Sequence, residues 1–245
     1  MNHPIDLYWL KQTEADLPAE NDWLSANEAL HLKGLRFAKR RADWLLGRWT
    51  AKCALAARLD APAYPRVLAK LEIRPAASGA PEVFWAGKSA AVTISLSHRS
   101  GAALCVVAEA GVQLGCDLEL IEPRSDAFVA DYFTNEEQKL LTRMPSADRP
   151  RMLALLWSGK ESALKALHEG MRLDTRCVVV APEARLGDVR GWSPLTVCYS
   201  RYQDFHGWWR QADDMVLAVV ADPPPEAPIL LENPPRVLEG LIQCA

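Results

Sequence analysis

Two short stretches of this 245-residue chain carry acidic and basic side chains whose types and spacing could support chemistry. In the first, from Val112 to Leu120, Asp117 and Glu119 alternate with apolar residues, a pattern typical of a half-buried strand. Both carboxylates would project from one face of that strand, about 7 Å apart. Two such carboxylates repel each other, so the pattern predicts a positive group beside them.

The second stretch, from Trp157 to Lys165, lacks strand alternation and fits a helix. Glu161 and Lys165 would lie one turn apart at the edge of its apolar arc. Lys160 falls in the middle of that arc, where a lysine is rarely buried without a partner. Its position predicts either a helix face that lines a site or a broken helix.

A third cluster is basic. Residues 33 to 52 include seven lysines and arginines against a single acid, Asp43. We expect a helix from about residue 35 to 59, in which four residues share one stripe: Arg41, Trp44, Arg48 and Lys52. A basic stripe alone is usually a solvated face. Together with the other motifs, this one predicts contact with an anionic ligand or an acidic partner protein.

A polar turn comes between two predicted strands, residues 92–97 and 102–108. Its sequence is Ser97-His98-Arg99-Ser100-Gly101, which predicts a hairpin. Histidine, arginine and small hydroxyl residues at a strand end can donate several hydrogen bonds to a phosphate. Polar hairpin tips are common, so this signal gains weight only from the other stretches.

Composition bounds the class of protein. The chain is 49% hydrophobic and 24% charged, as in ordinary globular proteins, and could form one large domain or two halves. No apolar run approaches the roughly 20 residues that span a bilayer, and residues 1–10 lack a secretory pattern, so we expect a cytoplasmic protein. A net charge of -3 argues against general affinity for nucleic acid or membranes.

The six cysteines are scattered and the five histidines show no metal-ligand spacing. We therefore expect reduced cysteines and no zinc site. Any metal would be held by oxygen ligands, as magnesium prefers.

Turn-forming and capping residues, together with the periodicity of the apolar residues, predict the remaining elements. We expect strands at residues 5–10, 67–74, 176–180, 195–200 and 215–221, and a helix at residues 128–143 with a cap at Thr134. The helix that contains Lys160 should end near Gly170. The pattern predicts an α+β fold with two similar halves, residues 1–110 and 111–221, followed by a proline-rich, extended or poorly ordered tail at residues 222–245.

Taken in order, three blocks resemble the signature of 4′-phosphopantetheinyl transferases, which reads G-[VI]-D-[IVL]-E, F-x-x-x-E and W-[ST]-x-K-E-[AS]-x-x-K. They are Gly115-Cys116-Asp117-Leu118-Glu119, Phe133 with Glu137, and Trp157-Ser158-Gly159-Lys160-Glu161-Ser162-Ala163-Leu164-Lys165. Weaker agreement comes from residues 44–48 and 94–98. The resemblance covers about residues 30–221, and the length is similar to that of the surfactin-synthetase-activating (Sfp-type) class. It implies a monomer of two pseudo-symmetric halves with the active site at their interface.

The resemblance implies an enzyme that moves 4′-phosphopantetheine from coenzyme A to a serine of an apo acyl or peptidyl carrier protein, releasing adenosine 3′,5′-bisphosphate. It implies a magnesium ion, or manganese in its place, on Asp117, Glu119 and Glu161. Such transfer depends on positioning and charge neutralisation. The carrier should be acidic and steered by the basic N-terminal half, whether it serves fatty acid, polyketide or nonribosomal peptide synthesis.

The resemblance also implies a role for each candidate residue. Glu161 would be a metal ligand, the acceptor of the serine proton, or both, and with Asp117 and Lys165 it forms the predicted catalytic set. The expected coenzyme A contacts are Arg41, Arg48, Ser97, His98, Lys160 and Lys165. One departure concerns Gly79-Ala80-Pro81, where the family often has a basic residue in place of Ala80. That phosphate contact would either be missing or be supplied by Arg99 or Lys88.

Simpler roles could account for the same residues. Asp117 and Glu119 could face solvent while Glu161 and Lys165 form a helix salt bridge worth about 0.3–0.5 kcal/mol. A coenzyme A-binding or carrier-binding protein without transferase activity would keep the basic cluster and lose the carboxylates, all three of which are present. A magnesium-dependent phosphohydrolase usually brings further clustered Asp or His residues, which the sequence lacks.

Overall fold

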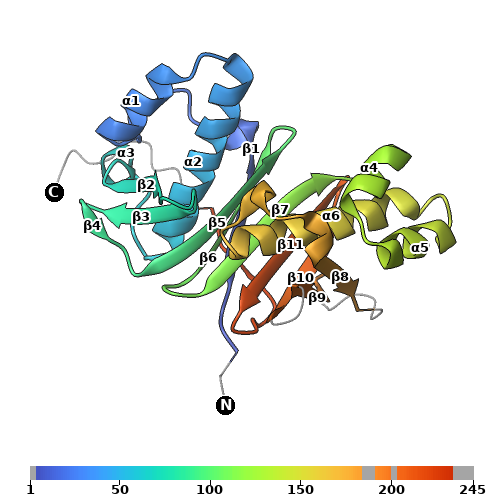
Figure 1. Cartoon of the computed structure of the whole chain (residues 1–245). Helices are drawn as coiled ribbons and strands as arrows, with labels where there is room; N and C mark the ends of the chain where they lie inside the picture. Colours follow the sequence, from blue (N-terminus) through green and yellow to red (C-terminus); the bar gives the residue numbers. More distant parts are fainter. Residues whose placement is uncertain (1–3, 184–190, 200–202, 234–245) are drawn as a thin grey trace.

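The structure is a computed structural model that describes residues 4–183, 191–199 and 203–233, and its fold is α+β as predicted (Figure 1). The helices are α1 (Ala26–Gly34), α2 (Ala38–Arg58), α3 (Pro65–Leu68), α4 (Asp126–Tyr132), α5 (Asn135–Arg143) and α6 (Arg149–Ala166), with short 3-10 turns at Glu14–Asp16, Gly170–Arg172 and Thr175–Cys177. The strands are β1 (Tyr8–Thr13), β2 (Leu71–Pro75), β3 (Pro81–Trp85), β4 (Lys88–Ser89), β5 (Val92–Arg99), β6 (Ala102–Glu109), β7 (Gln113–Leu120), β8 (Val178–Pro182), β9 (Ser193–Tyr199), β10 (Gln203–Ala212), β11 (Met215–Asp222) and β12 (Ile229–Leu230).

The strands form three sheets, ordered β12-β1-β6-β5, β7-β11-β10-β9-β8 and β2-β3-β4. Helix α2 packs on the first sheet and α6 on the second. Figure 1 shows the first sheet with α1 to α3 on one side of the molecule and α4 to α6 on the other. The edge strands β5 and β7 lie between these two groups.

The two larger sheets repeat one topology. In the N-terminal half a strand (β1), a long helix (α2) and a hairpin (β5–β6) follow in order, and β1 pairs antiparallel with β6. In the C-terminal half β7, α6 and the hairpin β10–β11 follow in the same order, and β7 pairs antiparallel with β11. This repetition agrees with the expected similarity of the two halves.

Each half also contains a buried lysine–glutamate pair, which we call a clamp. In the N-terminal clamp, Lys52 of α2 lies 2.6 Å from Glu28 and donates to the carbonyls of Trp23 and Leu68 at 2.9 and 3.0 Å. Glu28 closes the capping box of α1 and also accepts from the backbone N–H of Ile73 at 3.2 Å. One carboxylate therefore joins the start of α1, the middle of α2 and strand β2.

The C-terminal clamp is built in the same way. Lys160 of α6 lies 2.9 Å from Glu137 and donates to the carbonyls of Thr175 and Val178. Glu137 closes the capping box of α5 and accepts from the backbone N–H of Val180 at 3.1 Å. The two lysines stand in similar sequences, Trp49-Thr50-Ala51-Lys52 and Trp157-Ser158-Gly159-Lys160.

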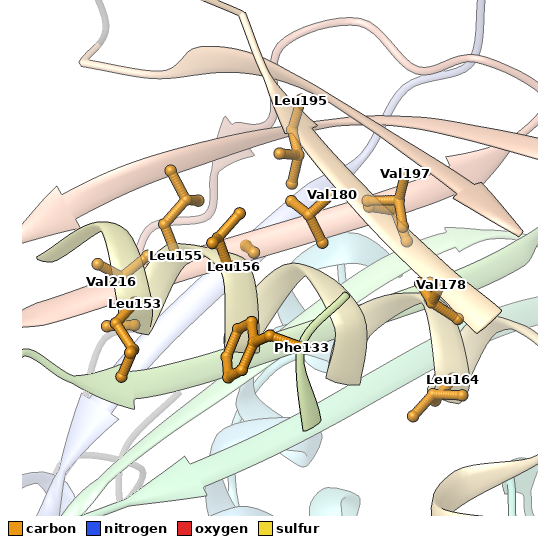
Figure 2. Packing of buried hydrophobic residues seen from close by; sticks show 14 of the residues in the cluster. Phe133, Leu153, Leu155, Leu156, Leu164, Val178, Val180, Leu195, Val197 and Val216 are labelled. Carbon is orange, nitrogen blue, oxygen red and sulfur yellow. The ribbon is translucent and has the colours of Figure 1, made fainter. Parts of the chain in front are cut away.

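The clamp corrects one expectation about Lys160. Its side chain is fully buried inside an unbroken helix, so Lys160 neither lines a site nor breaks α6. Figure 2 shows the surrounding core, in which Leu156 and Leu164 of α6 lie among Val178, Val180 and neighbouring side chains. A buried lysine is tolerated there because Glu137 and two carbonyls satisfy its three N–H donors.

Three predicted elements differ from those observed. The strand expected at residues 67–74 is α3 followed by β2, because Pro65 starts a helical turn. The helix expected at 128–143 is two helices, since Thr134 caps α5 as predicted and thereby ends α4. The turn expected at 97–101 is shorter, because β5 continues to Arg99.

The tail returns to the first sheet. Strand β12 pairs in parallel with β1, and the N–H groups of Ile229 and Leu231 donate to the carbonyls of Leu7 and Trp9 at 2.8 Å. The described tail is thus extended up to Asn233, and the rest of it lies outside the described residues. Within the described ranges, none of the helices combines the length and the apolar character needed to cross a bilayer.

Candidate active site between the two sheets

The site is built where the edge strands β5 and β7 meet. Two serine hydroxyls of β5 bridge them: Ser95 Oγ accepts from the N–H of Cys116 at 2.9 Å, and Ser97 Oγ accepts from the N–H of Leu118 at 3.3 Å. Serine side chains thus replace part of the hydrogen bonding that a continuous sheet would supply. These two hydrogen bonds join the edge of β7 to β5 of the N-terminal half.

Asp117 is buried at this junction, in contrast to a solvent-facing position. Helix α6 covers the face of β7 that carries Gly115, Asp117 and Glu119. A Cβ atom at Gly115 would lie 1.7 Å from the carbonyl oxygen of Ser162, so only glycine lets the helix approach this closely. The glycine of the first signature block therefore brings α6 against the carboxylates.

Asp117 binds two side chains through one oxygen. Its Oδ1 atom accepts from Ser97 Oγ at 2.8 Å and from Lys165 Nζ at 2.8 Å. Its Oδ2 atom is buried and has no hydrogen-bond partner among the described residues. Because a buried carboxylate oxygen is costly to leave unpaired, Oδ2 is the atom best placed to accept a cation or a donor from a ligand.

Lys165 is the positive group that pairs with Asp117. It also donates to the carbonyl of Cys116 at 2.9 Å. Burial by itself lowers the pKa of Lys165, but the carboxylate of Asp117, with a smaller contribution from Glu161, outweighs it and the net shift is upward. Lys165 is therefore cationic at neutral pH and suits charge neutralisation, not proton abstraction.

Glu161 and Glu119 have the opposite environment. Burial raises the pKa of both carboxyl groups, and the negative charge of Asp117 raises each further. Glu119 is partly compensated by Arg124 at 3.0 Å and Arg99 at 3.6 Å. The three carboxylates thus lie close enough to oppose one another's ionisation, which agrees with the predicted need for positive charge.

These residues fit an oxygen-coordinated metal only in part. Among the described residues, no group of three His, Cys, Asp or Glu side chains is arranged as a set of metal ligands. Lys165 and two arginines instead bind Asp117 and Glu119. The unpartnered Oδ2 of Asp117 and the carboxylate of Glu161, whose ionisation is disfavoured by burial and by Asp117, nevertheless supply the hard oxygen donors that magnesium prefers.

A cavity of about 860 Å³ opens beside this cluster, a size typical of sites for cofactors. Its walls come from α1, α2, the loop between β2 and β3, β5, and the end of α6. The wall residues that bear on ligand binding are His31, Trp44, Arg48, Arg74, Ala80, Ser97, His98, Lys165 and His168. Ser97 and Lys165 are both wall residues and partners of Asp117, so Asp117 lies directly behind the wall.

Four of the six expected coenzyme A contacts line this cavity: Arg48, Ser97, His98 and Lys165. The other two do not. Arg41 instead donates to the carbonyl of Leu32 at 2.7 Å and helps to cap α1, and Lys160 belongs to the C-terminal clamp. The four residues of the stripe expected on α2 therefore have three different roles. Arg41 caps α1, Trp44 and Arg48 line the cavity, and Lys52 belongs to the N-terminal clamp.

Arg48 and His98 are the wall residues best suited to bind phosphate. Arg48 Nε is buried 3.9 Å from Glu28 and makes no hydrogen bond to any described residue, so a donor is available on this wall. Burial lowers the pKa of His98, and Lys165 lowers it further, although Asp43 acts in the opposite direction. His98 is thus neutral near pH 7 until an anion beside it favours the charged form.

Several wall residues carry no distinct signal in the sequence. His31 and Trp44 stack with ring centroids 5.1 Å apart and offer a planar apolar surface. Arg74 lies on the same hairpin as Ala80 and lines the cavity, whereas neither Arg99 nor Lys88 does. Arg74 is therefore the basic residue that stands near the position where the family often has one. In the sequence, the alternation of polar and apolar residues along β2 is the only feature that points to Arg74.

Comparison with known proteins gives the same class. Residues 113–220 match the family model of the 4′-phosphopantetheinyl transferase superfamily. This segment contains Asp117, Glu119, Glu161 and Lys165, together with both residues of the C-terminal clamp. Residues 113–220 are thus similar to that superfamily, and this segment contains the three blocks on which the sequence resemblance rests.

Two individual proteins are similar to parts of this chain. The chain is 32% identical over 106 residues to the 4′-phosphopantetheinyl transferase HetI of Nostoc sp., a match that covers 41% of this chain and 44% of that protein, less than half of its length. A crystal structure of a holo-(acyl-carrier-protein) synthase from Bacillus anthracis, in complex with CoA (3′,5′-ADP), matches with 23% identity and a TM-score of 0.36, covering 44% of this chain and 97% of that one.

Proposed function

We propose that this chain is a 4′-phosphopantetheinyl transferase that moves the 4′-phosphopantetheine group of coenzyme A to a serine of an apo carrier protein. The products would be the holo carrier and adenosine 3′,5′-bisphosphate. The proposal extends to the Sfp-type class, a monomeric state, a cytoplasmic location and the division into residues 1–110 and 111–221, with the tail from residue 222.

The observation that carries the proposal is the position of the carboxylate cluster behind the wall of the cavity. A nucleotide with several phosphates needs basic donors, and Arg48, His98 and Lys165 line the same space. The cluster behind that wall offers the unpartnered Oδ2 of Asp117 and the carboxyl group of Glu161, whose pKa is raised. The superfamily match covers the residues that form this cluster.

The reaction forms a bond between the serine oxygen of the carrier and the β-phosphorus of coenzyme A. The bond from that phosphorus to the oxygen shared with the adenosine phosphate breaks, and its electron pair leaves with adenosine 3′,5′-bisphosphate. Glu161 would accept the serine proton, since its raised pKa makes it a better base than an ordinary carboxylate. Lys165 would hold the diphosphate, and Arg48 and His98 would hold the 3′-phosphate and the diphosphate.

Magnesium, or manganese in its place, would be held by Asp117, Glu119 and Glu161 and would neutralise charge on the diphosphate. Glu161 would then be a ligand, a base, or both. Metal dependence has a direct test: transfer should stop when EDTA is added and resume with excess magnesium. Transfer that continues in EDTA would contradict this assignment.

The function is tested by mass spectrometry of an apo acyl carrier protein incubated with coenzyme A and magnesium. We expect a mass gain corresponding to one phosphopantetheine with the wild-type protein. With Asp117→Ala the transfer rate should fall by about 1,000-fold or more, because that variant removes the shared partner of Ser97 and Lys165. Asp126→Asn is the matched control, since Asp126 is exposed and does not line the cavity.

The same experiment separates the transferase from a coenzyme A-binding or carrier-binding protein without transferase activity. A protein that binds coenzyme A in calorimetry but never changes the mass of any apo carrier would support that alternative. Presenting acyl and peptidyl carriers side by side, and comparing early mass shifts, would identify the preferred carrier class.

A further inference from the structure

A second, smaller hollow lies on α1 and shares two wall residues with the main cavity. Its volume is about 380 Å³, and it is lined by Asn27, Leu30, His31, Gly34 and Leu35. Asn27 and His31 also line the main cavity. Whatever occupies this hollow therefore lies directly beside the ligand of the main cavity.

Two large apolar side chains are exposed on the hollow and on the segment that follows it in the chain: Leu30 lines the hollow, and Phe37 comes two residues after its last lining residue, Leu35. Leu30 and Phe37 are 70% and 73% exposed, the two highest values among the large apolar side chains that the structure describes. Leu30 lies in the last two turns of α1, and Phe37 directly precedes α2. Large side chains so exposed, and so close together in the chain, are typical of surfaces that become covered by a partner.

Basic side chains lie close to these two residues in the sequence. Lys33, Arg36 and Arg40 are exposed, and within the described ranges they form no ion pair. Lys39 is the exception, because it pairs with Asp43 at 2.9 Å. Residues 30 to 40 contain no acid, although the whole chain has a net charge of -3. The partner should therefore present carboxylates around an apolar side chain.

The C-terminal half provides an internal comparison. Helix α5 occupies the place of α1 in the repeated topology and also carries a hollow of about 380 Å³. Its lining is polar throughout: Asn135, Gln138, Lys139, Thr142 and Arg143. Counted from the capping boxes, Lys139 corresponds to Leu30. The apolar centre is thus confined to the hollow that adjoins the main cavity, and the repeated fold does not require it.

We propose that Leu30 and Phe37, with Lys33, Arg36 and Arg40, form the docking surface for the acidic carrier protein whose serine is modified. This inference rests on the proposed function. The apolar pair binds an apolar side chain of the carrier and the basic residues bind carboxylates around it. Docking there places the carrier beside the wall formed by His31, so its serine can reach the main cavity.

The test measures transfer kinetics with an apo acyl carrier protein of negative net charge as the probe. Leu30→Gln/Phe37→Ser and Arg36→Glu/Arg40→Glu should each raise KM for the carrier about tenfold or more, with kcat within about twofold of the wild type. The Kd for adenosine 3′,5′-bisphosphate should not change, because none of the four residues lines the main cavity.

The matched control is Lys139→Glu/Arg143→Glu, which reverses charge on the hollow of α5 and should leave KM within about twofold of the wild type. If the surface variants also leave KM unchanged while the wild-type protein transfers normally, the docking surface is overturned and the proposed function stands. If the wild-type protein transfers nothing to any apo carrier, the proposed function fails, and the docking surface fails with it.

Discussion

The environment of Glu161 in the folded protein disfavours the ionised form of its carboxyl group. Its pKa is raised by burial and by Asp117, so ionising it in the folded state costs free energy that the unfolded chain does not require. Below the unfolded pKa the group is neutral in both states. The penalty appears as pH rises through the range between the unfolded and the folded pKa, and it is complete above the folded pKa.

Glu161→Gln should therefore increase thermal stability at about pH 7.5, by roughly 2–4 °C if about 1 kcal/mol is relieved, and should lose this advantage near about pH 4. The same variant should be nearly inactive in transfer. Differential scanning calorimetry at the two pH values, without metal, measures the effect. Equal melting temperatures for variant and wild type at the higher pH would show that the ionised form of Glu161 does not destabilise the folded protein.

His98 gives a second pH dependence at the residue scale. A phosphate bound beside it favours the imidazolium form, so ligand binding takes up a proton. The affinity for adenosine 3′,5′-bisphosphate should rise as pH falls from about 8 towards the pKa of His98, by up to about tenfold per pH unit. Calorimetric titrations across this range should show a flatter profile for His98→Gln. Protonation of the phosphate itself acts in both proteins and cancels in the comparison.

At the scale of elements, the clamps explain why two signature blocks occur together. Glu137 of the second block and Lys160 of the third are the two halves of one buried pair, and Glu161 follows Lys160 directly in α6. The clamp thus fixes α6 against α5 and β8, and with it the register of Glu161 and Lys165 against β7.

Lys160→Met should destabilise the protein by about 3–5 kcal/mol, because it leaves the carboxylate of Glu137 buried without a cation. The variant Lys160→Met/Glu137→Gln should recover part of this loss. Lys52→Met, in the N-terminal clamp, should cost a similar amount, since Lys52 is equally buried and has the same kinds of partner. Urea denaturation measures all three. A loss below about 1 kcal/mol for Lys160→Met would contradict the clamp.

Local patterns in the sequence predict the elements that carry the site. The alternation around Asp117, the cap at Thr134 and the helix around Glu161 all agree with the structure. Alternation cannot reveal that α6 covers the polar face of β7, because that contact depends on a glycine and on a helix much later in the chain. The burial of Asp117 is therefore a property of the tertiary fold, which the strand pattern alone does not contain.

The basic helix shows a different limit of local patterns. Helical spacing correctly places Arg41, Arg48 and Lys52 along α2, but spacing does not tell what covers each turn. Arg41 meets the end of α1, Arg48 the cavity and Lys52 the core. The repeated Trp-[Thr/Ser]-x-Lys sequence does carry a signal that Lys160 is a structural residue, because its counterpart Lys52 lies outside the signature blocks.

At the scale of the whole molecule, charge is unevenly distributed. The basic segment around Arg36 faces an acidic carrier in the proposed complex, whereas the chain as a whole is slightly negative. Long-range attraction of this kind speeds encounter and is screened by salt.

The association rate with the carrier should therefore fall about three- to tenfold between low and physiological ionic strength. Stopped-flow fluorescence with a labelled apo carrier measures it. The charge-reversed variant Arg36→Glu/Arg40→Glu should show a much weaker dependence on salt. An association rate of the wild type that does not respond to salt would rule out electrostatic steering.

The short strand β12 has a consequence for how the chain is made. It covers the outer edge of β1, and β1 is translated long before it. Until residues 229–231 emerge from the ribosome, the carbonyls of Leu7 and Trp9 on this side of β1 have no strand beside them, and an uncovered edge is a template for pairing with another chain. Nascent chains that stall or end before β12 should thus be the species that aggregate during synthesis.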